Sequence, residues 1–240
     1  MITEVFESRF FGTNTYVVGC LTTRKAVVID PFGKIADIIG AVKKWDLKVE
    51  YILNTHAHAD HVWLNGKLKK IYGAKIAIHE LDAPSLGKFR WYLLPAGRVR
   101  LSPPADLLLN DGDLIKIGTI DLEAIHTPGH TKGSVCFRHQ KKLFAGDTLM
   151  AGTVGRASLK TNDFEILLHS IKEKLLVLSD DITVYPGHGP KTAIETERKY
   201  NPFLKADEKW LKEFLKDPAR FWGQRPKDRQ DEPSDKADSH

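Results

Sequence analysis

The chain of 240 residues is long enough for one sizeable domain, and its hydrophobic fraction of 42% and charged fraction of 28% are ordinary for a globular protein. Part of the net charge of +5 comes from helix faces such as residues 67–70, and no basic run is interleaved with aromatic residues, so we expect no nucleic-acid partner. Glu4, Glu7 and Arg9 stand where a secretory leader needs apolar residues, and no apolar run is long enough to span a membrane. The two cysteines form no CxxC pair, so the sequence predicts a cytoplasmic protein without disulfides and without a membrane partner.

Strands and helices alternate through the first third of the chain. Apolar runs over 16–20 and 26–30 lie on either side of a polar turn, which predicts a β-hairpin. The spacing of apolar residues predicts a helix over 35–45 and another from about 61 to 72, which Gly73 can end. The sequences at 49–54 and 74–79 are predicted to be strands.

The remainder of the chain is richer in strands. Residues 84–105 hold four prolines and lack apolar periodicity, which predicts a long surface loop beside the site. Strands are expected from about 113 to 146 and over 182–185. Helices are expected at three places, namely 163–177, 191–200 and about 204–215.

The order of these elements predicts an α/β fold in which two sheets pack face to face with helices outside. Periodicity alone leaves other α/β arrangements open. We expect one domain over residues 1–222. The sequence at 223–240 has almost no apolar side chains and predicts a disordered polar tail.

The densest group of ligand-type side chains lies at residues 55–61, ThrHisAlaHisAlaAspHis. This segment follows a predicted strand and precedes a predicted helix, so we expect a loop at a sheet edge. His56 and His58 are two residues apart and can point at one cation, whereas Asp60 and His61 at the helix start can reach a second. Imidazole and carboxylate ligands suit zinc, iron or manganese.

Three later segments each place one further ligand-type residue beside glycine. His130 lies in a Pro-Gly turn, Asp147 follows a predicted strand, and His188 follows another within TyrProGlyHisGly. A single histidine in such a turn is more often an ordinary turn residue. Glycine lets the backbone crowd a site, and together with the first segment these residues complete two coordination shells.

These motifs resemble those of the metallo-β-lactamase superfamily, in which HisxHisxAspHis is followed by TPGHT, GDT and PGHG. The resemblance runs from ValIleAspPro at 28–31 to residue 189. It implies a four-layered αββα sandwich with the site at the sheet edges. It also implies that Asp147 bridges two metal ions, each bound by three further residues, and these residues are His56, His58 and His130 for the first ion and Asp60, His61 and His188 for the second.

The chemistry of such a site is hydrolysis. Two divalent metal ions hold a water between them and lower its pKa toward neutrality. The resulting metal-bound hydroxide attacks an electrophilic carbonyl, and Asp60 orients it and accepts its proton. Zinc is the first choice for both ions, and iron and manganese are the alternatives.

A few other residues are predicted to support the site or the core. The resemblance implies that Asp30 supports the loop of the first two histidines, with a turn-capping aspartate as the alternative. Thr131 and Ser134 are expected to fix the turn to which they belong. Arg156 either contacts substrate or pins a loop, of which we favour the structural role, and Cys136 is expected to lie in the core.

Within the superfamily the chain is most similar to glyoxalase II-like proteins, which hydrolyse thioesters such as hydroxyacyl-glutathione. True β-lactamases with this first motif usually lack the bridging aspartate, and tRNA-processing nucleases add an RNA clamp that we do not find. The sequence after His188 is too short for the C-terminal glutathione-binding domain of glyoxalase II, so its short relatives are the nearer match. We therefore expect a dinuclear thioesterase that acts on a small molecule, for which an anionic thioester is one candidate.

Two other functions stay open. Persulfide dioxygenases share this fold and use one iron, held by counterparts of His56, His130 and Asp147, all of which are present. A non-catalytic metal-binding module is the third possibility, and the water-activating carboxylate of Asp60 argues against it. The sequence does not define the oligomeric state.

Overall fold

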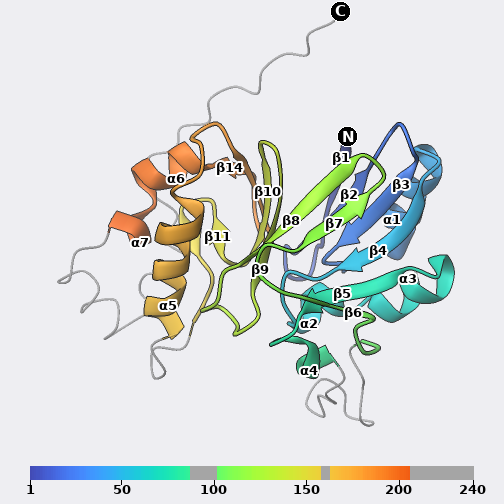
Figure 1. Cartoon of the computed structure of the whole chain (residues 1–240), viewed down its shortest axis with the longest axis horizontal. Helices are drawn as coiled ribbons and strands as arrows, with labels where there is room; N and C mark the ends of the chain where they lie inside the picture. The colour runs from blue at the N-terminus through green and yellow to red at the C-terminus, as the bar shows by residue number, and fades with distance from the viewer. Residues whose placement is uncertain (87–101, 158–162, 206–240) are drawn as a thin grey trace, which may run out of the picture. The chain divides into compact units, whose positions relative to one another are not determined.

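Two six-stranded β-sheets form the centre of the fold (Figure 1). The computed structural model describes residues 1–86, 102–157 and 163–205. The elements discussed below belong to the unit Met1–Leu204, and the chain beyond it forms a second unit. The predicted tail at 223–240 and all but the first two residues of the helix predicted at 204–215 lie outside the described residues.

The first sheet has the strand order β1-β2-β3-β4-β5-β6. Strand β2 is antiparallel to both β1 and β3, whereas β3, β4, β5 and β6 run parallel to one another. Parallel strands bring their carboxyl ends to one edge of a sheet, so the loops that follow β3, β4 and β5 meet there. The strands are β1 (Ile2–Glu7), β2 (Asn14–Gly19), β3 (Lys25–Ile29), β4 (Lys48–Leu53), β5 (Lys75–His79) and β6 (Leu107–Leu109).

The second sheet has the strand order β14-β13-β10-β9-β8-β7. Only β10 and β13 are parallel, and the other neighbours are antiparallel. A small separate ribbon joins two short strands that follow β10. The strands are β7 (Leu114–Ile117), β8 (Ile120–His126), β9 (Val135–His139), β10 (Lys142–Gly146), β11 (Leu149–Met150), β12 (Thr153–Val154), β13 (Thr183–Pro186) and β14 (Thr192–Ala193).

Alternation along β3 builds two separate cores. Val27 packs in one buried cluster with Phe137 and Phe144 of the second sheet. Its neighbour Val28 faces the opposite way and belongs to a second cluster, which includes Leu68. Successive side chains of a strand point to opposite faces, so the first core joins the two sheets and the second joins the first sheet to helices.

Helices form the outer layers. Helices α1 (Ile35–Lys44) and α3 (Asn65–Tyr72) cover the first sheet, and α5 (Asp163–Ser170) and α6 (Ile194–Tyr200) lie beside the second (Figure 1). This arrangement confirms the predicted αββα sandwich. The remaining short helices are α2 (Ala59–Val62), α4 (Ala83–Leu86) and α7 (Pro202–Lys205).

The predicted helix from about 61 to 72 was wrong in one respect, because two helices occupy this region. The first, α2, begins at Ala59, and the chain leaves helical geometry at Leu64 before α3 starts. The amide of Leu64 donates to the carbonyl oxygen of Pro31 at 3.1 Å instead of continuing α2. The expected end at Gly73 is confirmed, since this glycine adopts the left-handed conformation with φ of 66°.

Several other boundaries differ from the sequence predictions. Strands β1 and β6 were not expected. The helix predicted at 163–177 changes after Ser170 into a π-helical turn, η2 (Ile171–Leu175), and the helix predicted at 191–200 begins only at Ile194 because β14 precedes it. Most of the predicted loop at 84–105 lies outside the described residues, although α4 occupies its start. Within the described part of the chain, no helix is both long and apolar enough to cross a lipid bilayer.

Candidate metal centre

All seven predicted ligand residues follow strand ends and meet at one edge of the sandwich. His56, His58, Asp60 and His61 come after β4, on the loop that leads into α2. His130 lies between β8 and β9, Asp147 follows β10, and His188 follows β13. Because β10 and β13 are parallel neighbours, the residues after them emerge side by side.

The first cluster consists of His56, His58 and His130. His56 Nε2 lies 2.9 Å from His58 Nδ1, and His130 Nε2 lies 3.2 Å from His56 Nε2 and 3.0 Å from His58 Nδ1. The three nitrogen atoms therefore face a common point. Together with a carboxylate oxygen of Asp147, these ligand atoms all lie within 4.8 Å of one another.

The second cluster consists of Asp60, His61 and His188. His61 Nε2 lies 3.3 Å from His188 Nε2, and Asp60 Oδ2 lies 3.6 Å from the former and 3.5 Å from the latter. These ligand atoms also lie within 4.8 Å of one another. The second cluster thus converges on a point of its own.

Asp147 stands between the two clusters. Its Oδ1 lies 3.5 Å from His61 Nε2, and its Oδ2 lies 3.5 Å from both His130 Nε2 and His188 Nε2. One carboxylate therefore reaches both points of convergence. This is the position that a bridging ligand requires.

Hydrogen bonds on the far side of the rings leave the inward nitrogen atoms of four histidines as lone pairs when the rings are neutral. His61 Nδ1 is held by Asp30 Oδ2 at 3.0 Å, His130 Nδ1 by the carbonyl oxygen of Arg156 at 2.6 Å, and His188 Nδ1 by that of Phe11 at 3.0 Å. His56 Nδ1 lies 3.0 Å from Thr55 Oγ1, which donates its own hydrogen to Asp30 and so can accept from the ring. Lone pairs that face one another at about 3 Å repel unless a cation or a proton lies between them, so this donor set fits cations.

Asp147 supplies two further signs of a fit. Its Oδ1 is buried and has no hydrogen-bond partner among the residues that the structure describes. A buried carboxylate oxygen without a partner is costly, and a bound cation would remove that cost. Glycine is required beside it, because a Cβ at Gly187 would overlap Asp147 Oδ1.

The ionisable groups of the site shift one another's pKa values. Burial raises the pKa of Asp147, but the neighbouring His61, His188 and His56 outweigh this effect and hold that pKa well below the ordinary value. Burial lowers the pKa of His61, but the carboxylates of Asp147 and Asp30 outweigh it and raise that pKa to about 9. A proton on His61 therefore supplies the positive charge that the carboxylates lack when no cation is bound.

The first cluster shows the opposite behaviour. Burial, followed by the neighbouring His61 and His130, lowers the pKa of His56 well below its ordinary value. Burial and His130 lower the pKa of His58 to about 4. These two rings stay neutral near pH 7, which is the protonation state that a metal ligand needs.

Asp30 supports the loop after β4, as the resemblance implied. It is buried, and its carboxylate accepts hydrogen bonds from Thr55 N at 2.7 Å, Thr55 Oγ1 at 2.6 Å and His61 Nδ1 at 3.0 Å. Asp30 itself adopts the left-handed conformation with φ of 50°, which favours glycine or a short polar residue. These three hydrogen bonds extend beyond the capping of a single turn, which was the alternative role for Asp30.

Asp82 plays the matching role for the first cluster, and the sequence analysis missed it. Its buried carboxylate accepts hydrogen bonds from Ala57 N at 2.9 Å, Thr131 Oγ1 at 2.8 Å and Gly133 N at 2.9 Å. It thereby ties the loop of His56 and His58 to the loop of His130. The available signal was its place shortly after β5, at the same sheet edge as the other loops.

Other predicted supporting residues lie where expected. Ser134 Oγ accepts from Thr131 N at 3.0 Å and lies 2.7 Å from Thr131 Oγ1, so these residues fix their turn as predicted. Arg156 contributes its backbone carbonyl to His130, which agrees with the favoured structural role. Cys136 is fully buried in β9, as expected for a core residue.

The β1–β2 turn was not expected at the site, yet it contacts the second cluster directly. Thr13 Oγ1 donates to Asp60 Oδ2 at 3.0 Å, and Phe11 supplies the carbonyl that holds His188. Asn14 Nδ2 donates to the carbonyl oxygens of Pro186 and Gly189, on either side of His188. The turn therefore fixes the position of the last predicted ligand residue.

The match to a known family agrees with this geometry. The family model of the metallo-β-lactamase superfamily matches residues 8–188, so the chain belongs to this superfamily. Its members include hydrolases, and the chain's fold and its histidine and aspartate cluster are those of a metal-binding enzyme of this class.

Two curated relatives differ in their chemistry. The chain is 38% identical to hydroxyacylglutathione hydrolase GloC of Haemophilus influenzae over 75% of this chain and 88% of the relative. It is 31% identical to the mitochondrial persulfide dioxygenase ETHE1 of Mus musculus over 90% of this chain and 79% of the relative. The two enzyme functions weighed from the sequence therefore both appear among its relatives.

Solved structures are also similar. The B3 metallo-β-lactamase BLEG-1 superposes with a TM-score of 0.78 at 32% identity, covering 85% of this chain and all of the other. TTHA1623 in a di-iron-bound form superposes with a TM-score of 0.70 at 29% identity, with the same coverage. A related protein of this fold can thus hold two metal ions.

Proposed function

We propose that the chain is a dinuclear metal-dependent hydrolase that cleaves small acyl thioesters. The observation that carries the proposal is the convergence of the two clusters on separate points with Asp147 between them. A hydrolase with two cations has a use for every residue of both clusters. The 38% identity to a hydroxyacylglutathione hydrolase supports a thioester as the substrate.

Asp60 is the proposed proton acceptor. Divalent cations bound here would lower the pKa of a coordinated water and polarise a substrate carbonyl. Asp60 Oδ2 lies within 3.6 Å of both histidine nitrogens of its cluster, and the hydrogen bond from Thr13 fixes its orientation. Its side chain is 24% exposed, so a proton taken from the water can pass on to solvent.

A thioester suits this arrangement because the chain needs no separate acid for the leaving group. The water oxygen forms a bond with the carbonyl carbon, the carbon–sulfur bond breaks, and the sulfur leaves with the electron pair. A thiol of pKa about 8.5 is a good leaving group as its thiolate. No serine or cysteine nucleophile is involved.

The proposal includes the remaining expectations on metal, substrate and cellular location. Zinc is the proposed metal because its preferred ligands are these side chains. Iron and manganese are the alternatives, and the di-iron relative supports iron. We propose a small-molecule substrate, of which an anionic thioester is one candidate, without a nucleic-acid or membrane partner. A cytoplasmic location agrees with the two buried free cysteines.

A mononuclear iron persulfide dioxygenase is the second candidate. The identity of 31% to such an enzyme favours it, and His56, His130 and Asp147 are sufficient for one iron. A one-iron enzyme has less use for a complete second cluster. For that reason we place it behind the hydrolase, and ahead of a non-catalytic metal-binding module.

The test compares the two reactions on one preparation. Zinc-loaded, iron-loaded and manganese-loaded protein is supplied with a hydroxyacyl thioester and, separately, with glutathione persulfide under oxygen. His188→Ala removes a second-cluster residue, and His139→Ala is the control, because the His139 side chain bonds to the carbonyl oxygen of Asp121, outside the site. We expect thioester cleavage that His188→Ala abolishes and His139→Ala retains.

Two outcomes would overturn the proposal. Iron-dependent oxygen uptake with negligible thioester cleavage, retained in His188→Ala, would promote the dioxygenase. Cation binding without turnover of either substrate would favour the non-catalytic metal-binding module over both enzymes.

A further inference from the structure

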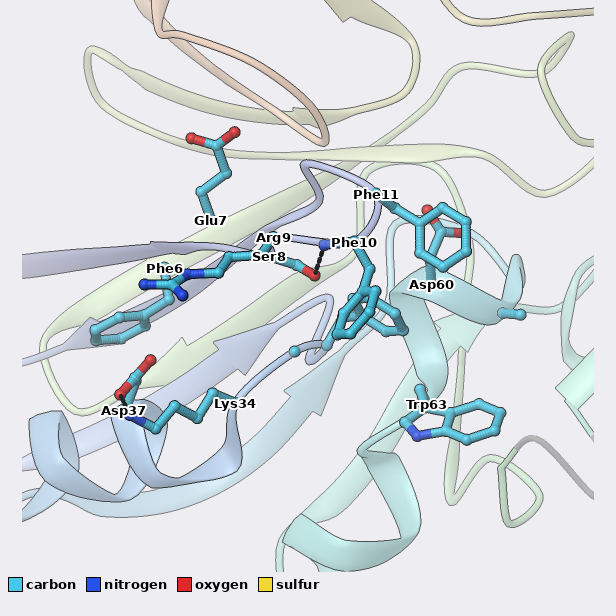
Figure 2. Close-up of a pocket in the computed structure, with 13 residues that line it drawn as sticks. Phe6, Glu7, Ser8, Arg9, Phe10, Phe11, Lys34, Asp37, Asp60 and Trp63 are labelled. Carbon is cyan, nitrogen blue, oxygen red and sulfur yellow. Dashed lines mark hydrogen bonds and ion pairs between the residues drawn. The ribbon is translucent and has the colours of Figure 1, made fainter.

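A cavity of about 840 Å³ opens beside Asp60, and five of the thirteen residues that line it are aromatic. Figure 2 shows Phe10 and Phe11 on the β1–β2 turn, with Asp60 on α2 and Trp63 just after that helix. The volume is in the range of cavities that hold small organic ligands. The other aromatic residues of the lining are Phe6 and Phe32.

These aromatic side chains are unusually open to solvent. Phe10 is 88% exposed, Phe11 is 65% exposed and Trp63 is 40% exposed. Exposed apolar side chains that gather around one hollow are the usual mark of a binding surface. Single exposed apolar residues elsewhere carry no such meaning, but here the exposed rings share one cavity.

Hydrogen bonds close the turn that carries Phe10 and Phe11. Ser8 N donates to Thr13 O at 2.9 Å, and Gly12 N donates to Ser8 O at 2.8 Å. Phe10 N donates to Ser8 Oγ at 3.3 Å, and Gly12 adopts a left-handed conformation with φ of 65°. A turn closed in this way presents its rings at little entropic cost on binding.

The same turn joins the cavity to the second cluster. The hydrogen bonds from Thr13 to Asp60 and from His188 to Phe11 both start or end on it. Asp60 itself lines the cavity. A substrate whose reacting carbonyl lies at Asp60 would therefore place one of its substituents against Phe10, Phe11 and Trp63.

Acidic residues slightly outnumber basic residues around the cavity. The lining includes two acidic residues, Glu7 and Asp37, and two basic residues, Arg9 and Lys34, besides Asp60. Lys34 Nζ lies 3.6 Å from Asp37 Oδ1, so this base already has a partner. The cavity therefore gives no strong preference for an anion, and the apolar rings decide what it accepts.

We propose that this cavity binds an apolar substituent of the substrate, of about the size of a phenyl ring. The inference rests on the proposed hydrolase function and deepens it, because it names as substrates those thioesters that carry such an apolar group. The apolar group belongs either to the acyl part or to the thiol part. Phe10, Phe11 and Trp63 are the residues that determine this specificity.

The test measures a ratio of rates and a binding affinity with the full chain. The ratio compares kcat/KM for a phenylacetyl thioester with that for a glycolyl thioester of the same thiol, and a second pair places the phenyl group on the thiol. The affinity is that of the corresponding non-hydrolysable phenyl thioether, followed by calorimetry. The double variant Phe10→Ser with Phe11→Ser removes both exposed rings, and Tyr200→Ser is the matched control, because Tyr200 is 63% exposed on α6 and does not line the cavity.

We expect the wild type to favour the phenyl substrate of one pair by about tenfold or more, as burial of a group of this size in an apolar pocket allows. The double variant should lose this preference and bind the thioether about tenfold more weakly. Tyr200→Ser should keep the wild-type preference for the phenyl substrate and the wild-type affinity for the thioether. Equal rates within both pairs, or a preference unchanged in the double variant, would overturn the inference.

The experiment gives a different result if the proposed hydrolase function itself is wrong. If the chain cleaves no thioester, the thioether affinity alone decides. An affinity lost in the double variant and kept in Tyr200→Ser supports the cavity as a binding site even then. An affinity that none of the variants changes overturns it.

Discussion

The two clusters of the site differ in how open they are to solvent. In the first cluster His56 is 1% exposed and the His130 side chain is 6% exposed. In the second cluster the side chains of Asp60 and His188 are 24% and 27% exposed, although that of His61 is only 1% exposed. Asp82 holds the loops of the first cluster, whereas Asp30 bonds directly to His61 of the second cluster and through Thr55 to His56 of the first. The second cluster contacts the β1–β2 turn, and its Asp60 lines the aromatic cavity.

This difference suits the two clusters to different roles in catalysis. The first contains the buried His56 and two partly buried histidines and is held by backbone and side-chain bonds, which suits a cation that stays in place. The second combines a partly exposed carboxylate with the mouth of a cavity, which suits proton transfer and substrate binding. The predictions below test this division, beginning with the residue that both clusters share.

Asp147→Ala should have the largest effect, because its carboxylate lies 3.5 Å from nitrogen atoms of both clusters. We expect kcat/KM for a thioester to fall by at least about a thousandfold, which corresponds to about 4 kcal/mol. Metal content, measured by plasma mass spectrometry, should fall at both positions. Retention of full metal content and of turnover within about tenfold would contradict the bridging role.

Asp60→Asn should lower turnover while the cations remain. The amide keeps the shape of the carboxylate and the bond from Thr13, but it cannot accept the proton from water. We expect kcat to fall by about a hundredfold or more, with a small change in KM. Steady-state kinetics on metal-replete protein would count against proton transfer by Asp60 if kcat changed less than about threefold.

Asp82→Asn should weaken the first cluster without touching a predicted ligand. It loses the charge that three donors share, so the loops of His58 and His130 are less well fixed. Metal affinity should fall by about tenfold to a hundredfold, and the control Asp121→Asn at an exposed position of β8 should leave it unchanged. Competition with a metal-binding dye measures both, and equal affinities in the two variants would show that Asp82 has no positioning role.

The smallest effect concerns the pH dependence of the metal-free chain. The low pKa of His58, about 4, means that stability decreases as the pH falls from the ordinary value of 6.5 toward 4, since the unfolded chain then binds the extra proton. The raised pKa of His61, about 9, means that stability decreases as the pH rises from 6.5 through 9, since the folded chain then holds the extra proton. The two clusters therefore respond in opposite directions.

Urea unfolding of chelator-treated protein can separate these contributions. His58→Gln should flatten the acid side of the stability curve, and His61→Gln should flatten the alkaline side. The same change of slope in both variants would contradict the difference between the clusters.

The seven candidate ligand residues could be picked out from their motifs, and their division between two metal ions followed from the resemblance to the superfamily. Parallel pairing of β10 and β13 explains why Asp147 and His188 emerge side by side, whereas His56 follows β4 of the other sheet. The spacing of apolar residues indicated two sheets with helices outside, and the resemblance implied the αββα order. Motifs and apolar spacing are properties of local sequence.

The parts that the sequence did not predict depend on contacts between distant segments. Asp82 acts through Ala57 and Thr131, which are far from it along the chain. The break at Leu64 depends on the carbonyl of Pro31. The aromatic turn at Phe10 and Phe11 carries no motif, and its importance follows only from its bonds to Asp60 and His188.

A count of metal ions in His188→Ala tests the two-cation centre most directly. Fully loaded wild-type chain and the control His139→Ala should each hold two ions, measured by plasma mass spectrometry against protein concentration. His188→Ala should hold one, because the first cluster keeps its three histidines and Asp147. A single ion in the wild type, unchanged by His188→Ala, would contradict the dinuclear site.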